Sequence, residues 1–231
     1  MTTPPDAAAE PARAPDRPGP ATPELATALD VGAICPYLVA SQGGWRSASP
    51  NRDHRCFAVD PPGASLDDFG WRVSIAELRA SGPFSAFPGC ERLILQLDGA
   101  PVTLRHDDGV VHPLAPLAPY RFSGERPTFG ALGAGPARDF NVITRRARWS
   151  ATLEVVHLAP GQEATVAVPA AALVHAHRGS CAVTFDDASR DLADGDAAIA
   201  HGDGVLTLAA GAQHALVLAV ALRAMPAEHR A

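Results

Sequence analysis

The sequence contains no lysine, and all 19 basic residues are arginine. A Schiff base and a Walker-type phosphate loop both depend on a lysine amine, so the sequence excludes both chemistries. Anion recognition stays open, because the planar guanidinium of arginine matches the two oxygens of a carboxylate. The formal net charge is -6, whereas nucleic-acid binding requires a basic face, so we expect no nucleic-acid partner.

Paired cysteines and long apolar runs are also missing. The four cysteines form no CxxC or CxxH pair, which argues against a zinc site and predicts free thiols in a reducing compartment. No run approaches the roughly 18 apolar residues of a membrane span. The first two dozen residues lack the apolar stretch of a signal peptide. We therefore expect a cytoplasmic protein that does not enter a membrane.

The residues that are present indicate short β-strands. Aromatic residues make up only 6% of the chain, so the core must consist mainly of aliphatic side chains. Residues 71–78 alternate apolar and mostly polar positions, the period of a half-buried strand. Residues 92–97 and 102–106 are expected to be strands, and Asp98-Gly99 between them is a turn signal. Similar runs continue to residue 222, a spacing typical of a barrel or sandwich.

The two halves of the chain share one pattern. The segments RLILQLDGAPVTLRHDDGVVHPL (92–114) and ALVHAHRGSCAVTFDDASRDL (172–192) both read as strand, glycine turn, strand, Asp-containing turn, strand. This similarity predicts a duplicated β-barrel. The proline- and alanine-rich residues 1–24 are expected to form a disordered tail, and residues 224–231 a short one.

Three segments carry a family resemblance: FGWRVSIAELRASGPFSAFPG at 69–89, followed by Arg92, YRFSGERP at 120–127 and GPARDFNVITRR at 135–146. In this order they resemble the motifs of the HutD/Ves family. The resemblance implies an all-β tandem double cupin with few short helices, with barrels at 31–148 and 149–223. It also implies a link to histidine utilisation or stress responses, without an established reaction. The family's Trp-Lys-Asn-Gly-Gly-Gly element is altered here, since residues 41–46 read SQGGWR and the lysine is absent.

The polar residues of these motifs are the first candidate site. Arg72 and Ser74 share one strand face by the two-residue period, while Glu77 falls on the other. Charged groups inside a barrel require a partner or a ligand. One interpretation is a structural network in which Arg72 pairs with Asp139. The other is a carboxylate-binding pocket, with these expected ligand-binding residues: Arg72, Ser74, Arg92, Asn141, Arg145, Phe84 and Phe87.

Histidines of the second half are the other candidate site. His175 and His177 form a His-x-His pair, and the later His214 could join them as a metal ligand. No carboxylate follows the pair closely, as it does in metal-binding cupins, and alternating histidines are also common on exposed strands.

These observations leave three functions open. The leading hypothesis is a non-enzymatic binder of a small carboxylate, without a cofactor and with a regulatory role in histidine utilisation. The alternative is a metal-dependent cupin enzyme that uses His175, His177 and His214. The third is a scaffold that acts as a homodimer through edge-to-edge association.

Overall fold

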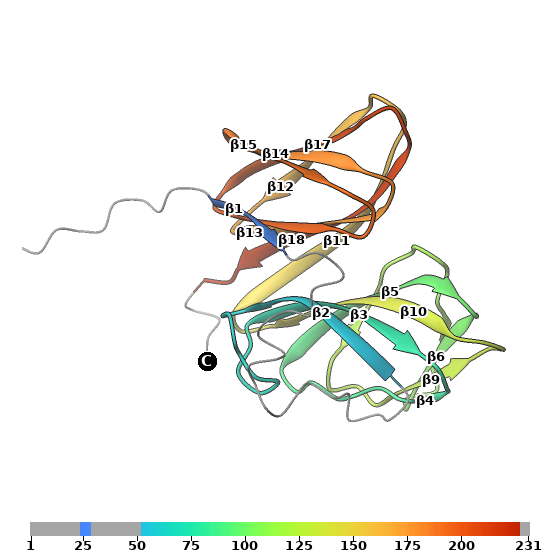
Figure 1. Ribbon diagram of the computed structural model, residues 1–231. Helices are drawn as coiled ribbons and strands as arrows, with labels where there is room; N and C mark the ends of the chain where they lie inside the picture. The colour runs from blue at the N-terminus through green and yellow to red at the C-terminus, as the bar shows by residue number, and fades with distance from the viewer. Residues whose placement is uncertain (1–23, 29–51, 227–231) are drawn as a thin grey trace, which may run out of the picture.

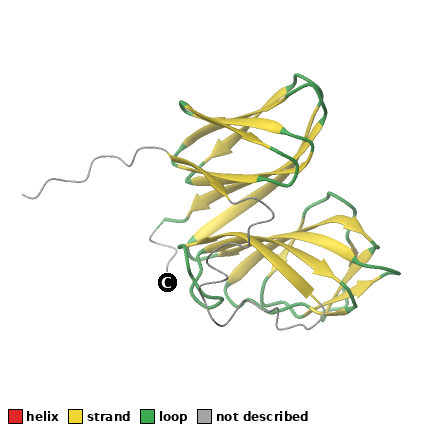
Figure 2. Ribbon diagram, viewed as in Figure 1, coloured by secondary structure: helices red, strands yellow, loops and turns green. Residues whose placement is uncertain are grey.

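The computed structural model describes residues 24–28 and 52–226, and every regular element in these ranges is a β-strand (Figure 2). The fold is therefore all-β, as predicted. The few short helices expected from the sequence do not occur in the described ranges. Most of the predicted tail at 1–24, the glycine segment at 41–46 and residues 227–231 lie outside the described residues.

The first half of the chain forms two antiparallel sheets. Its strands are β2 Arg52–Asp60, β3 Trp71–Leu78, β4 Gly82–Pro83, β5 Cys90–Gly99, β6 Val102–His106, β7 Val111–Pro113, β8 Tyr120–Ser123, β9 Thr128–Leu132 and β10 Ala137–Arg145. The five-stranded sheet has the order β2-β3-β10-β5-β8, and the four-stranded sheet has the order β4-β9-β6-β7. Together these sheets form the first barrel.

The second half repeats this arrangement. Its strands are β11 Trp149–Leu158, β12 Glu163–Val168, β13 Ala171–Arg178, β14 Cys181–Phe185, β15 Ala188–Leu192, β16 Ala197–His201, β17 Gly204–Ala210 and β18 Ala215–Ala224. The order β11-β18-β13-β16 matches β3-β10-β5-β8, and β12-β17-β14-β15 matches β4-β9-β6-β7. The structure thus confirms the duplication that the repeated sequence pattern predicts.

One strand crosses the boundary expected between the halves. Strand β1 (Glu24–Ala28) pairs antiparallel with β16, at the edge of the second barrel's five-stranded sheet. In the first barrel the additional strand, β2, lies at the opposite edge, beside β3. The second barrel therefore includes residues from the start of the chain as well as the expected range 149–223.

The two five-stranded sheets face each other in the middle of the molecule, and the four-stranded sheets lie on the outside (Figure 1). A shared apolar cluster joins the sheets and includes Trp71, Phe140 and Leu218. Each large apolar side chain that is fully buried stabilises the fold by about 1.5–3 kcal/mol. Because strand residues alternate between faces, the residues next to this cluster point into the barrels.

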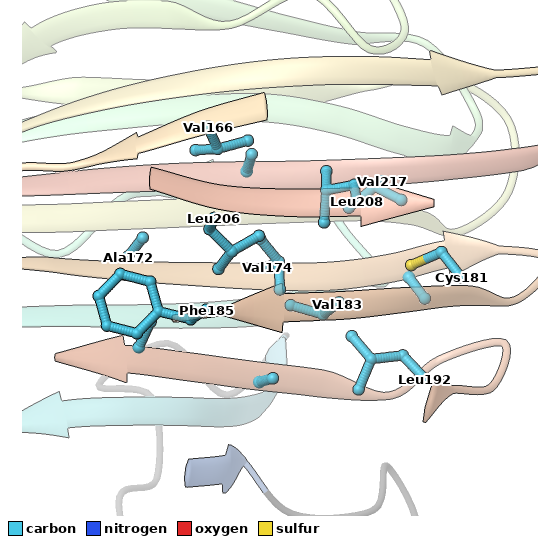
Figure 3. Close-up of a cluster of buried hydrophobic side chains, with 14 of the residues drawn as sticks. Val166, Ala172, Val174, Cys181, Val183, Phe185, Leu192, Leu206, Leu208 and Val217 are labelled. Carbon is cyan, nitrogen blue, oxygen red and sulfur yellow. The ribbon is translucent and has the colours of Figure 1, made fainter. Parts of the chain in front are cut away.

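The interior of the second barrel is apolar. Its cluster contains side chains from both sheets of this barrel, among them Ala172, Val174, Phe185 and Leu206, each at most 1% exposed (Figure 3). The thiol of Cys181 lies in the same cluster and is free. This interior is a packed core.

Matching glycines mark corresponding turns in the two barrels, where the chain passes from the five-stranded sheet to the four-stranded one. Gly99 ends β5 with φ +89°, and Gly179 follows β13 with φ +73°. A Cβ atom at Gly99 would lie 2.3 Å from the carbonyl oxygen of Pro136, and one at Gly179 would lie 2.3 Å from that of His214. Both positions therefore require glycine. Gly99 and Gly179 therefore occupy the same position in the two barrels. Starting from this pair, the strand pairing shows which residue of the second barrel corresponds to each residue of the first.

Candidate functional site

The inner face of the first barrel's five-stranded sheet is polar. On β3, Trp71, Val73 and Ile75 pack toward the second barrel, so the alternate residues Arg72 and Ser74 face inward. Strands β5 and β10 add polar residues to the same face. Among the side chains of this sheet whose burial is described, the inward polar residues are Arg72, Ser74, Arg92, Gln96, Asp139 and Asn141, each at most 5% exposed.

A hydrogen-bonded chain connects three of these residues. Arg92 donates from Nε and Nη2 to Oδ1 of Asn141, at 3.1 and 2.6 Å. The Asn141 side-chain nitrogen in turn donates to Oδ1 of Asp139. The amide therefore lies between a buried guanidinium and a buried carboxylate and orients both.

Aromatic rings flank the guanidinium of Arg92. Its Cζ lies 4.5 Å from the ring centroid of Phe84 and 5.4 Å from that of Phe122. A cation over an aromatic face is stabilised by roughly 2 kcal/mol when water is excluded. Gly130 leaves space for this arrangement, because a Cβ there would lie 2.5 Å from Cε2 of Phe84.

His106 extends the polar interior to the four-stranded sheet. Thr128 donates its hydroxyl hydrogen to the carbonyl of Arg126, at 2.9 Å, so its oxygen accepts from Nδ1 of His106, also at 2.9 Å. Nε2 then accepts from the hydroxyl of Tyr120 at 3.1 Å. Burial lowers the pKa of His106, so the neutral ring with hydrogen on Nδ1 is the form at neutral pH.

Charged side chains are buried inside the first barrel. Among the buried side chains in the described ranges, Arg72 and Arg92 are the two guanidiniums and Asp139 is the one carboxylate. Gln96 adds no charge and has a structural role: it donates to the carbonyl of Ala100 at 2.8 Å and so stabilises the turn after β5. The side chains whose burial is described thus include two guanidiniums and one carboxylate inside this barrel.

The second barrel shows that this fold does not need a polar interior. Strand pairing places Ala172 at the position of Arg92, and Ala219 at the position of Asn141. The remaining pairs in the comparison are Gln96 with Ala176, Asp139 with Val217, His106 with Phe185 and Thr128 with Leu206. Every second-barrel member is a buried apolar residue. Folding therefore does not require the polar residues on β5, β6, β9 and β10. Arg72 and Ser74 of β3 match the exposed polar residues Thr152 and Glu154 of β11, so this conclusion does not extend to them.

Two predicted ligand-binding residues lie in contacts that close one end of the first barrel. Arg145 donates to the carbonyls of Phe69 and Asp67, at 3.1 and 2.6 Å. The ring of Phe87 meets that of Phe69 edge to face, with centroids 6.1 Å apart. Arg145 and Phe87 therefore stabilise the loop before β3. The sequence analysis had placed both side chains in a ligand pocket. Arg72, Ser74, Arg92, Asn141 and Phe84 are the predicted residues that lie inside the barrel.

The predicted metal set of His175, His177 and His214 does not form. His175 stacks on Phe140 of the first barrel, with centroids 6.1 Å apart, and donates from Nδ1 to the carbonyl of Asp196 at 3.1 Å. His214 is exposed in the turn before β18. Within residues 24–28 and 52–226, no group of three or more His, Cys, Asp or Glu residues could hold a metal ion. The sequence pattern was misleading because the histidine face of β13 packs against the first barrel.

An open hollow of about 540 Å³ lies beside the end of β3 and contains none of the predicted site residues. Glu77 and Arg79 line it and form an exposed ion pair, 3.2 Å between Nε and Oε1. Glu77 therefore lies on the face opposite Ser74, as its spacing predicts. The described chain also has no helix with the length and hydropathy of a membrane span.

The sequence interpretation missed His106, Thr128 and Gln96. His106 lies two residues after Leu104 and four after Val102, both of which are buried. Because side chains alternate along a strand, the inward orientation of His106 could have been predicted from the sequence. Thr128 had no such signal, because the sequence of β9, TFGAL, shows no clear alternation of polar and apolar residues.

The duplicated strand order, with one polar and one apolar interior, defines the molecule as a double cupin. A cupin 2 conserved barrel domain protein from Leptotrichia buccalis has the same fold, with a TM-score of 0.53 and 9% identity over 77% of this chain and 92% of that chain.

The chain belongs to the HutD family, whose model matches residues 55–218. HutD from Pseudomonas fluorescens SBW25 is 29% identical with a TM-score of 0.63, covering 76% of this chain and 90% of that chain. The conserved protein of unknown function PA5104 from Pseudomonas aeruginosa PAO1 is 28% identical with a TM-score of 0.70, covering 88% of this chain and 100% of that chain.

Curated relatives match a shorter part of the sequence. Protein Ves from Escherichia fergusonii is 40% identical over 103 residues, which is 44% of this chain and 51% of the relative. An uncharacterized 21.2 kDa protein in the hutC 3' region of Pseudomonas putida is 42% identical over 92 residues, 40% of this chain and 48% of the relative. The chain thus spans about half the length of the curated relatives it matches.

Proposed function

We propose that this protein binds a small carboxylate metabolite inside its first barrel. The supporting observation is the buried polar lining around Arg92, Asn141 and Asp139, at positions that are apolar in the second barrel. A guanidinium in such a lining can recognise the two oxygens of a carboxylate ligand. The protein would act without a catalysed reaction or cofactor, in the cytoplasm.

The side chains suit recognition of a carboxylate. A guanidinium can bind both carboxylate oxygens in one plane, which gives orientation as well as attraction. The hydroxyl of Ser74, opposite Asn141 on the neighbouring strand, adds a directional hydrogen bond. Phe84 and Phe122 would exclude water from the pair and so strengthen it.

The names of the relatives support the same context. One solved relative is HutD from Pseudomonas fluorescens SBW25. The Pseudomonas putida relative lies in the hutC 3' region. We propose a regulatory role in histidine utilisation on this basis.

A thermal-shift screen tests the proposal. Formate, histidine, urocanate and acylated glutamates are compared with uncharged amides of similar size. A ligand that binds only the folded state raises the melting temperature, because it adds RT ln(1 + [L]/Kd) to the free energy of unfolding. We expect at least one carboxylate, and none of the amides, to raise it. The absence of any carboxylate-specific shift would refute the proposal.

A further inference from the structure

Two histidines of the second barrel lie in its contact with the first barrel. On β13, Ala176 belongs to the core of the second barrel, so His175 and His177 on either side of it face away from that core. The ring of His175 stacks on Phe140 of the first barrel with 13° between the planes, and the two histidine rings are 6.0 Å apart. His175 is 2% exposed and His177 is 7% exposed. Two titratable rings are therefore buried between the barrels.

The first barrel supplies the comparison for this pair. Its matching residues are Leu95 and Leu97, which belong to the apolar cluster shared by the barrels and are at most 2% exposed. Leu97 and His177 also occupy matching β-bulges, because the register of β5 with β10 and that of β13 with β18 each shift at this residue. The same backbone therefore buries leucine in one barrel and histidine in the other. Nothing in this backbone requires the two histidines.

Charged side chains of both barrels lie near His177. Asp98 and Arg138 belong to the first barrel and form an ion pair with each other. Arg178 and Asp194 belong to the second barrel. Arg138 and Asp194 also act on His175, as does the neighbouring His177. The carboxylate that the first barrel brings to His177 is therefore already engaged by a guanidinium.

Both rings are neutral at neutral pH. Burial lowers the pKa of His175 to about 4, although the hydrogen bond to the carbonyl of Asp196 opposes the change. Burial is also the main reason that the pKa of His177 is lowered, and Arg178 and Arg138 lower it further. Nε2 of His177 is buried and has no hydrogen-bond partner among the described residues. The cationic ring carries hydrogen on both nitrogens, so protonation would leave a buried charged donor without an acceptor.

The histidines lie far from the described link between the barrels, which is the turn at 146–148 between β10 and β11. The pairing of β11 with β18 and of β18 with β13 places Trp149 level with the start of β13 and His177 at its other end. Trp149 meets Trp71 of the first barrel edge to face, with centroids 6.5 Å apart. Separation at the histidine end therefore does not require the loss of the apolar contact at the Trp149 end.

We propose that His175 and His177 make the contact between the two barrels sensitive to acid: when the rings gain protons, the five-stranded sheets separate at this end while each barrel stays folded. Separation hydrates the charged rings and moves them away from Arg138. The proposal concerns the face of β10 that carries Phe140, so it does not depend on a ligand inside the first barrel.

The direction of the pH dependence follows from the buried state of the rings. Each ring resists a proton in the contact that it accepts in water, so the contact is fully stable above pH 6.5 and weakens as the pH falls toward about 4. Each proton taken up on separation shifts the equilibrium about tenfold per pH unit, and two protons shift it about 100-fold.

Small-angle X-ray scattering and far-UV circular dichroism of the full chain, recorded from neutral pH to about pH 4.5, test the proposal. We expect the radius of gyration to rise reversibly in acid while the β-sheet signal is unchanged. The double variant His175→Leu/His177→Leu introduces the residues of the first barrel and should abolish the rise. His214→Leu is the matched control, since His214 is exposed in the same barrel, and should keep the rise. Circular dichroism at neutral pH checks that the variants are folded.

The single variant His177→Leu tests the role of the second ring and can be measured even where the double variant does not fold. It should reduce the pH dependence of the transition from about 100-fold to about tenfold per pH unit, because one proton is taken up in place of two. A constant radius of gyration in the wild type would overturn the proposal. The same rise in His177→Leu as in the wild type, or a rise accompanied by loss of the β-sheet signal, would overturn it as well.

Discussion

Arg92 and Ala172 occupy the same position in the two barrels: Arg92 pairs with Ile143 across β5 and β10, and Ala172 pairs with Ala221 across β13 and β18. One residue is a guanidinium held by Asn141, and the other is part of an apolar core. Alanine at this position is therefore sufficient for the fold, and the guanidinium of Arg92 belongs to the candidate site.

The second barrel should not tolerate the side chain that the first one holds. Ala172→Arg would place a guanidinium among apolar side chains, where charge burial costs several kcal/mol. Ala172→Met controls for volume, since overpacking alone costs about 1–3 kcal/mol. Urea unfolding should show that Ala172→Arg loses at least about 3 kcal/mol more than Ala172→Met. Equal losses would mean that the interior accommodates charge without a polar network.

Two turn glycines, Gly99 and Gly109, should differ in their tolerance of a side chain. Gly99→Ala combines a φ of +89° with a Cβ 2.3 Å from the Pro136 oxygen, and should cost more than about 2 kcal/mol. Gly109→Ala has a similar φ of +84° and no atom within 4 Å, so only about 1 kcal/mol is expected. The free energies of unfolding measure the difference. Equal costs would contradict the close approach at Gly99.

Stability should fall in mild acid because of His175. Burial lowers the pKa of His175 from 6.5 to about 4, so the folded ring resists a proton that the unfolded chain accepts. The stabilisation is complete above pH 6.5 and is lost progressively between 6.5 and 4, by at most about 3 kcal/mol. His175→Leu, the residue type at the matching Leu95, should flatten this dependence in thermal melts. The exposed His214→Leu serves as control and should keep the wild-type dependence.

Local patterns predicted the fold well. The alternation at 71–78 predicted the strand Trp71–Leu78, which is buried on both faces and not half-buried. The Asp-Gly signal predicted the turn at Gly99, where the chain passes from one sheet to the other. Alternation also placed Arg72 and Ser74 on one face. These features depend on residues that are close together in the chain, so they can be predicted from a single sequence.

Long-range packing was not predictable in the same way. The histidines on β13 alternate as metal ligands do, but their face packs against Phe140 of the other barrel. Strand β1 joins the second barrel although it begins the chain. Arg145 belongs to a binding motif by sequence, yet its donors reach the backbone of Phe69 and Asp67. Each of these facts depends on a partner that is distant in sequence.

Calorimetric titration of formate and urocanate into the wild type and the Arg92→Met variant tests the central claim most directly. Methionine can fill the volume without charge, and replacing a buried ion by an apolar residue is often neutral for folding. The account predicts binding at one site per chain in the wild type, an affinity at least about tenfold lower in Arg92→Met, and no change in the exposed control Arg190→Met. Equal affinity in all three chains, or no heat in the wild type, would contradict it.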